Sequence, residues 1–475
     1  MDQENIQTST QTTEQKPIKK KNKFLRFLKW FFITILGLIV LFFFIPIILG
    51  IIFRDIPPID NSDLQLPVVI IPDDQNIYFN LVAKDEKTGL MNKPKIVFIF
   101  TGSSTEQDLK DMVSGKKAWD EKVVKEFVFQ NEKAFNQLSQ VVNKKYFQNP
   151  NLIDQNKVTD IVIFSDETVL PPVNSFWYFP YFGAVRAHYL IKQNKDKEAF
   201  DEMFNILRLA QKIQDSQLTF LQYFGARTMK ERGLDFLQTT VASSTLTAAE
   251  LIQYSQEIDE FYNSRDGFAK AVKLEYHLWI NNIDYRMTNK DSSQEIPSLP
   301  EGYFPSFSSF YFHPNEVKLL IANMARCELK QTEECMARLR EEDSFDEFES
   351  LEQNNTAAFL FKMYTTKNIG GRLLFSILME PSLIPSWDRY MMEKEMKVAQ
   401  TQAILALKAF KNDTGNLSAS LDELTPKYLP VTYIEKVGKD ALKYIPEKKI
   451  IYTVGTDGKD DGGDPTKDDV YQITF

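Results

Sequence analysis

The sequence predicts a mostly α-helical ectodomain, made of helical hairpins in a bundle or a solenoid, that follows one transmembrane helix. A small C-terminal α+β domain, a long helix with an antiparallel three-stranded sheet, is expected to complete the chain. Three observations predict this: an unbroken apolar run at 30–53, apolar residues recurring every three or four positions over much of 109–285, and three short β-prone pieces after residue 440. No repeat consensus is present, so bundle and solenoid both remain open.

Composition restricts the class of protein. The 475 residues are 43% hydrophobic and 25% charged, which is typical of a folded chain and excludes a collagen-like or wholly disordered one. The net charge of −9 argues against a general nucleic-acid-binding protein, because that role needs a broad basic face. Three histidines and two cysteines leave few ligands for zinc sites or histidine-centred chemistry.

The apolar run from Trp30 to Phe53 contains 24 residues without a charge. At about 1.5 Å per residue, a helix of this length exceeds a hydrocarbon core roughly 30 Å thick. A buried soluble helix is the alternative, but such helices are seldom apolar on every face for so long. The run is also longer than the roughly 7–15 residues of a signal-peptide core, so we expect a retained anchor.

Charge asymmetry predicts the orientation of this span. Residues 1–29 contain seven Lys or Arg and three acids, a net charge of +4, while the rest of the chain carries −13. Basic residues beside a first span stay in the cytoplasm, so we expect a disordered cytoplasmic tail and an extracytoplasmic C-terminal bulk at the cell membrane. The lipid bilayer is then the first expected partner.

Local patterns after the span predict the order of the remaining elements. Several prolines in 54–72 predict a spacer, and Lys95–Phe100 is the strongest strand-like run that follows. Helical periodicity holds from Leu109 to Val142 and from Phe182 to about Tyr285, and helices are expected again from Glu316. The predicted organisation is a basic tail (1–29), a transmembrane helix (30–53), a spacer (54–72), a mostly helical ectodomain (73–384) and a C-terminal domain (385–475).

The sequence contains no recognisable catalytic motif. Neither a nucleophile elbow, nor a His-Glu-x-x-His pair, nor a phosphate-binding loop is present. His188, His277 and His313 are far apart, and a lone histidine in a helix is most often structural. Acidic residues are abundant, but their spacing singles out no pair for acid–base catalysis. We therefore expect a protein that is not an enzyme.

The two cysteines, Cys327 and Cys335, are eight positions apart. On one unbroken helix they would lie about 12 Å apart, too far to bond. A turn at 330–332 would bring them together, and an oxidising extracytoplasmic compartment would favour a disulfide. Two separate buried thiols are the alternative, and the disulfide is the favoured prediction.

The C-terminal region predicts a long helix from Trp387 to Phe410 and strands near 442–445, 450–454 and 470–474. The loop between the last two strands contains six Asp and four Gly in fifteen residues, 455–469. Ca²⁺ takes six to eight oxygen ligands, and glycine lets the backbone curl so that these converge. The alternative is a solvated acidic turn.

This region resembles the globular part of a type II secretion major pseudopilin. The resemblance rests on ALKAFKNDTGNLSASLDELTPKYLP after a helix, and on YTVGTDGKDDGG followed by the adjacent pair Asp468-Asp469 before the last strand. It covers about the last 85 residues and implies a Ca²⁺ site in the loop. The implied ligands are the Val454 carbonyl, Asp457, Asp464, Asp468 and Asp469, with Asp460 or Asp461 in a nearby position.

The chain also departs from that family. The Asp-Pro-Trp/Phe-Gly segment that usually precedes the strands in that family is replaced here by residues 435–440. The apolar run also lacks the glutamate that follows a prepilin cleavage site. We therefore do not expect processing and polymerisation as a pilin.

The sequence favours a membrane-anchored extracytoplasmic binding or assembly protein with a Ca²⁺-stabilised C-terminal module. Its expected partners are proteins of the cell envelope or of secretion or pilus-like machinery, and no nucleic acid is expected. The alternatives are a cell-envelope hydrolase, which would need an acidic cleft with shifted carboxylate pKa values, and a structural α-solenoid scaffold.

Overall fold

The computed structural model describes residues 23–52, 54–84, 86, 91–100, 105–154, 156, 176–262, 265–288, 312–330, 334–335, 338–339, 366–378, 387–429, 442–454 and 459–475. This part of the chain is mostly helical, and it has a three-stranded antiparallel sheet near the C-terminus, as the sequence predicts.

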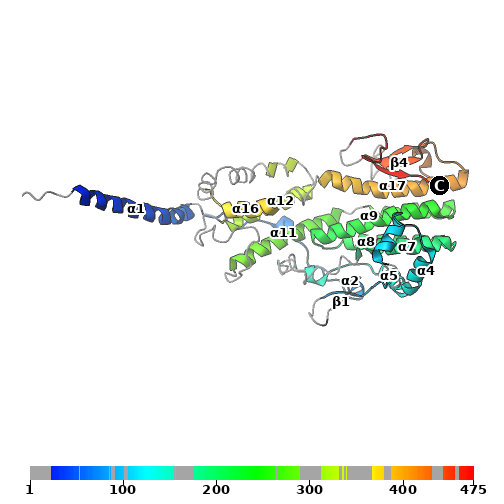
Figure 1. Cartoon of the computed structure of the whole chain (residues 1–475), viewed down its shortest axis with the longest axis horizontal. Helices are drawn as coiled ribbons and strands as arrows, with labels where there is room; N and C mark the ends of the chain where they lie inside the picture. Colours follow the sequence, from blue (N-terminus) through cyan, green and yellow to red (C-terminus); the bar gives the residue numbers. More distant parts are fainter. Residues whose placement is uncertain are drawn as a thin grey trace, which may run out of the picture.

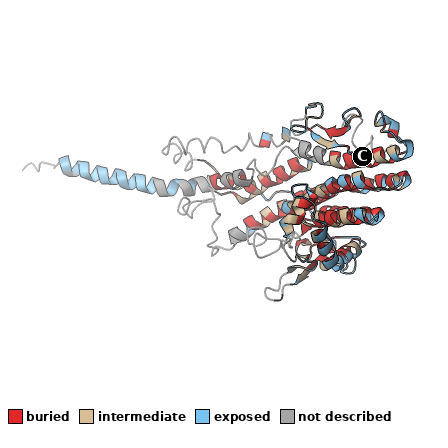
Figure 2. Cartoon of the chain, turned by 45° about the vertical axis from the view of Figure 1, so that its right-hand side comes forward, coloured by how far each residue is buried: buried red, intermediate tan, exposed pale blue. Residues whose placement is uncertain are grey.

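Helix α1 (Lys23–Ile52) extends away from the rest of the molecule (Figure 1). Its described side chains, at 23–24, 26–41, 44–45 and 48, are exposed, including those of large apolar residues (Figure 2). Among the described residues, no helix is both long enough and apolar enough to cross a membrane.

The segment that follows α1 is bound to the helices rather than standing clear of them as a spacer. It contains the 3₁₀ turn η1 (Ser62–Leu64), and Leu64 and Leu66 are buried. His277 of helix α11 (Arg265–Thr288) places its Nε2 atom 3.1 Å from the Leu64 carbonyl oxygen. This histidine is therefore buried and structural, as expected for a lone histidine in a helix.

Helix α2 (Tyr78–Leu81) is followed by a short antiparallel hairpin, which consists of β1 (Val82–Lys84) and β2 (Met91–Pro94). The prediction of a strand at Lys95–Phe100 is wrong: within the described residues this segment belongs to no strand and pairs with none. Ile96 and Phe98 point into the core, which explains the strand-like alternation. The backbone polar groups of Ile99 bond instead to the Asn131 side chain, at 2.7 and 2.9 Å.

Three short helices cover the region from 105 to 142, where the sequence predicts helical periodicity from Leu109 to Val142. Thr105 caps the first with a capping box, and Asp120 caps the second. Gly115 adopts φ +71° just after the first helix, a conformation that favours glycine. The helices are α3 (Glu106–Val113), α4 (Glu121–Gln130) and α5 (Glu132–Val141), followed by the 3₁₀ turn η2 (Pro150–Leu152).

The centre of the molecule is a packed set of three helices, in which α8 contacts both neighbours and α7 also contacts α9. Two glycines allow close approach: a Cβ at Gly183 would meet Ile206, and one at Gly233 would meet Leu207, both on α8. Buried residues occur along almost the whole length of α8, because this helix packs against both α7 and α9. The helices are α7 (Phe179–Lys192), α8 (Asp196–Gln214) and α9 (Phe220–Ser243).

The following helices extend the body toward α1. Thr247 and Glu250 form a capping box at the start of the next helix, four residues after α9 ends at Ser243. Helix α12 contacts both α11 and α16. The remaining elements are α10 (Ala248–Glu257), the 3₁₀ turn η4 (Ile258–Phe261), α12 (Pro314–Lys330) and α16 (Ile369–Leu378).

Helix α17 (Trp387–Thr414) lies between the helical body and the C-terminal sheet (Figure 1). Gln238 of α9 donates from Nε2 to Gln400 Oε1 at 3.1 Å and to Thr401 Oγ1 at 2.9 Å. Gln402 Nε2 donates to the Ser255 carbonyl of α10 at 2.8 Å. The C-terminal region therefore shares one hydrophobic core with the preceding helices.

The C-terminal strands have the order β3-β4-β5, all antiparallel. Every residue of β4 is buried, because α17 covers this central strand. The elements are the 3₁₀ turn η5 (Asp422–Leu424), β3 (Lys443–Ile445), β4 (Ile450–Thr453) and β5 (Asp469–Gln472).

The disulfide that the sequence favours is present: Cys327, in the last turn of α12, is bonded to Cys335. Their Cα atoms are 5.4 Å apart, which is possible because α12 ends at Lys330, between the two cysteines; the turn predicted at 330–332 lies mostly outside the described residues.

Candidate functional site

The acidic loop (455–469) is the binding site that the sequence predicts, and the carboxylates described there pair with nearby groups of the protein itself. Asp464 accepts hydrogen bonds from the backbone and hydroxyl of Thr466, at 2.9 and 2.8 Å. Asp468 Oδ2 accepts from the Gly463 amide at 2.9 Å. Asp469 Oδ2 lies 3.6 Å from the Lys397 ammonium on α17.

The proposed ligand Val454 is half-buried at the end of β4, and Asp457 lies outside the described residues. Within the described part of the chain, no three loop carboxylates come close enough together to share an ion. Two buried loop oxygens nevertheless lack a hydrogen-bond partner there, Asp461 Oδ2 and Asp468 Oδ1.

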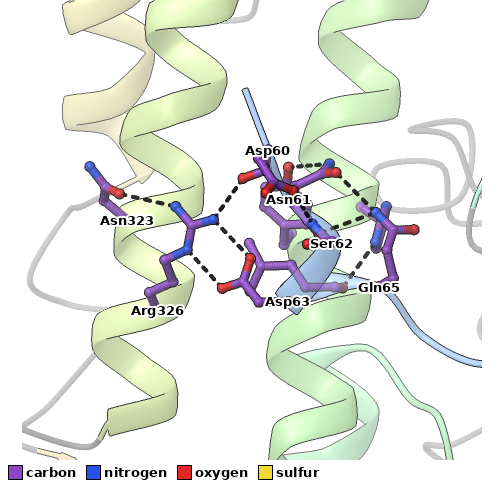
Figure 3. A network of polar contacts seen from close by, with 10 residues as sticks. Asp60, Asn61, Ser62, Asp63, Gln65, Asn323 and Arg326 are labelled. Carbon is purple, nitrogen blue, oxygen red and sulfur yellow. Dashed lines mark hydrogen bonds and ion pairs between the residues drawn. The ribbon is translucent and has the colours of Figure 1, made fainter. Parts of the chain in front are cut away.

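A second polar cluster fastens the chain leaving α1 to the body (Figure 3). Arg326 of α12 makes a two-pronged ion pair with Asp63, with both N···O distances 2.8 Å, and also donates to the Asp60 carbonyl at 2.9 Å. The Arg326 guanidinium lowers the pKa of Asp63. Asn61 Nδ2 lies 2.7 Å from the Tyr276 hydroxyl of α11, so η1 is tied to two helices.

Asp55 extends this attachment to the start of α12. Its Oδ2 accepts from the Asn315 amide at 2.8 Å, and its Oδ1 accepts from the Glu316 amide at 3.2 Å. Asn315 Nδ2 donates in return to the Ile56 carbonyl at 2.8 Å. Asp55 therefore caps the N-terminus of α12 although it lies 260 positions earlier in the sequence. A negative charge at this end of a helix also interacts favourably with the helix dipole.

A hollow of about 300 Å³ opens between α3, α7 and α9. Its lining combines aromatic rings and cations: Lys110 Nζ lies 3.7 Å from the ring centroid of Tyr178, and the Arg232 guanidinium lies 5.2 Å from that of Tyr181. The indole nitrogen of Trp177 has no hydrogen-bond partner among the described residues. The lining residues are Gln107, Lys110, Asp111, Ser114, Lys116, Trp177, Tyr178, Tyr181 and Arg232.

A smaller apolar cavity, with room for about one water molecule, is also lined by Trp177. Gln222 lines it as well, and its buried Nε2 has no partner within the described residues. Trp177 thus belongs to the lining of both a polar hollow and an apolar cavity.

Two buried glutamates have strongly raised pKa values, the property that the hydrolase alternative requires. Burial raises the pKa of Glu328 to about 8, with a further contribution from Glu275. Burial raises the pKa of Glu202 to about 7, although Arg186 lies 2.6 Å away and opposes this. Both side chains are almost fully buried and line neither cavity described above, so they form no acidic cleft there.

No local sequence pattern indicates the hollow or the Asp55 cap. The hollow is lined by three separate segments, 107–116, 177–181 and 232, and Asp55 lies 260 positions from Asn315; each residue is ordinary in its local context.

Comparison with known proteins adds no family to this description: no family model, curated protein or solved structure matches the chain.

The buried Glu328 predicts a pH dependence of stability. The folded protein holds this proton up to about pH 8, whereas an unfolded glutamate releases it near 4.5. The free energy of unfolding therefore falls as the pH rises from about 4.5 to 8, by as much as about 1.4 kcal/mol per pH unit from this group. We expect Glu328→Gln to flatten this slope in urea unfolding at pH 5.5, 7 and 8.5. Glu132→Gln, on the exposed face of α5, is the matched control, and an unchanged slope in Glu328→Gln would contradict the assignment.

Proposed function

We propose that this chain is a single-pass membrane protein whose extracytoplasmic body binds a ligand, with its basic N-terminal tail in the cytoplasm. The observation that carries the proposal is α1. Its sequence includes most of the 24-residue uncharged run, and its large side chains are open to solvent, with Phe24 68%, Trp30 69% and Leu36 62% exposed. Apolar exposure of this extent on a projecting helix is typical of a surface that contacts lipid or another protein.

The attachment of 55–66 supports this arrangement. A body that is tied to the base of its anchor by Asp55, Asp63 and η1 would keep a constant orientation to the bilayer. The proposed membrane span is the whole uncharged run of the sequence, residues 30–53, and includes side chains that the structure does not describe.

The anchor is tested by extraction and protease protection of the full chain. We expect the protein to stay in membranes through carbonate washing, and added protease to digest the body on intact cells while sparing the basic tail. Leu41→Arg, at the middle of the apolar run, should release much of the protein, because a central arginine costs about 2.5–3.5 kcal/mol. Phe24→Arg, outside the run, should not. Release of the unchanged protein by carbonate would contradict the anchor.

The hollow between α3, α7 and α9 is the proposed binding site. Concave sites that combine aromatic faces with a few polar groups are typical of small-ligand binding. Lys110, Lys116 and Arg232 outnumber the single acid Asp111 in its lining, and Trp177, Tyr178 and Tyr181 offer ring faces. We therefore propose an acidic ligand with a ring, of the class of acidic saccharides.

This binding is tested with glucuronic acid, and with glucose as the uncharged control, by saturation-transfer NMR on the full chain in detergent. We expect glucuronic acid to bind more tightly than glucose. Arg232→Ala should weaken its binding roughly tenfold or more through loss of a charge-assisted contact, whereas Lys133→Ala, exposed on α5, should leave it unchanged. Equal binding of the two sugars, or of Arg232→Ala and the unchanged protein, would exclude an acid-specific site.

We further propose that the acidic loop binds Ca²⁺, and that the C-terminal region is related to pseudopilins and contacts secretion or pilus-like machinery. The order of a long helix and three antiparallel strands agrees with that resemblance. The free oxygens of Asp461 and Asp468 are available to a hard cation.

The Ca²⁺ proposal predicts a rise of several degrees in the melting temperature of the full chain in millimolar CaCl₂, reversed by a chelator. Asp468→Asn should abolish the rise, while Asp422→Asn, an exposed acid in η5, should retain it. A melting temperature that does not respond to Ca²⁺ would remove the cation from the proposal.

A further inference from the structure

Three potential metal ligands meet at the base of the body, where the chain leaves α1. One ligand atom each from Asp55, His313 and Glu316 lie within 4.8 Å of one another. Asp55 belongs to the segment after α1, His313 precedes α12, and Glu316 lies in the first turn of α12. The Asp55 cap therefore creates the cluster, because it brings a carboxylate to the two residues that begin this helix.

His313 is the unusual member of the cluster. Its side chain is fully buried, and neither ring nitrogen has a hydrogen-bond partner among the described residues. Nδ1 lies 3.2 Å from Glu316 Oε1, but not in the alignment of a hydrogen bond. A buried imidazole with two unsatisfied nitrogens is costly and needs an explanation, and a bound cation that takes a nitrogen lone pair provides one.

We propose that Asp55, His313 and Glu316 bind a divalent transition metal ion of the Zn²⁺ class, with water completing the coordination. One imidazole and two carboxylates form a ligand set that Zn²⁺ and similar ions accept. Ca²⁺ and Mg²⁺ fit less well, because they prefer oxygen ligands and need more of them.

The surroundings already orient the ligands. Backbone amides hold both Asp55 oxygens, and the His313 amide donates to Asn368 Oδ1 at 2.8 Å. Asn368 Nδ2 contacts Glu316 Oε2 at 3.3 Å. Such outer contacts fix the direction of metal ligands.

Lys367 competes with a cation at this site, because its ammonium is paired with Glu316 Oε1. Its side chain is 37% exposed, so it has access to solvent when an ion takes its place. This competition gives the proposal a gain-of-affinity test: removing the ammonium should strengthen metal binding. A bound ion would also link the segment that follows α1, through Asp55, to the start of α12. The proposal does not depend on α1 lying in a membrane, or on Ca²⁺ in the acidic loop.

The test is a Co²⁺ titration of the full chain in detergent, followed by visible absorption, with Zn²⁺ as competitor. We expect one Co²⁺ per chain, with an absorption spectrum showing nitrogen and oxygen ligands, displaced by Zn²⁺. His313→Gln should weaken binding at least about tenfold, and Lys367→Met should strengthen it. His188→Gln, a histidine remote from the cluster, and Asp468→Asn, in the acidic loop, should bind as the unchanged protein does.

The absence of a saturable Co²⁺ spectrum would overturn the proposal, as would equal affinity in His313→Gln and the unchanged protein. Thermal unfolding without metal establishes whether His313→Gln folds. Should that variant fail to fold, Lys367→Met still decides, since it keeps all three ligands, and unchanged or weaker binding by it would contradict the site.

Discussion

The burial of the middle of α17, residues 398–407, on all faces is the constraint on which the rest of the structure depends. Gln400, Thr401 and Gln402 are consecutive and point in three directions, yet none is exposed to solvent. The sheet covers one side, where Gln400 Nε2 lies 3.4 Å from the Ile451 carbonyl, and α9 and α10 cover the others. Because these polar groups find partners only when all three layers are in place, the C-terminal region and the helical body stabilise each other.

This shared core changes the meaning of the pseudopilin resemblance. A pilin-like module appended to a helical protein would keep a surface of its own, whereas here Tyr471 of β5 donates its hydroxyl to the Gln238 carbonyl of α9 at 3.0 Å. Lys397 of α17 likewise lies between Asp235 of α9 and Asp469 of β5. A partner that binds this region would therefore contact a surface that is firmly packed against the helical body. A structural change in the acidic loop would be transmitted to α9.

At the opposite end of the molecule, polar bonds add to apolar burial. Leu64 and Leu66 are buried there, and Arg326 and the Asp55 cap attach the same short segment to α12 through hydrogen bonds and an ion pair. The same cap encloses His313, because it holds the neighbouring Asn315 and Glu316; among the described residues the His313 ring nitrogens have no hydrogen-bond partner.

The sequence determined the features that depend on local order. The helix from Trp387, the three strands, the helix from Pro314 and the cysteine pair follow from periodicity, turn residues and spacing, and these act within a few residues. The strand predicted at Lys95–Phe100 failed because burial alternates there while the described residues supply no partner strand, and the Asn131 side chain bonds the backbone of Ile99 instead. Only the tertiary structure decided that α17 is enclosed, that Trp177 and Arg232 line one hollow, and that Asp55 meets His313. The reason is physical: each of these depends on helix packing between residues far apart in the chain, and no local pattern records which faces will meet.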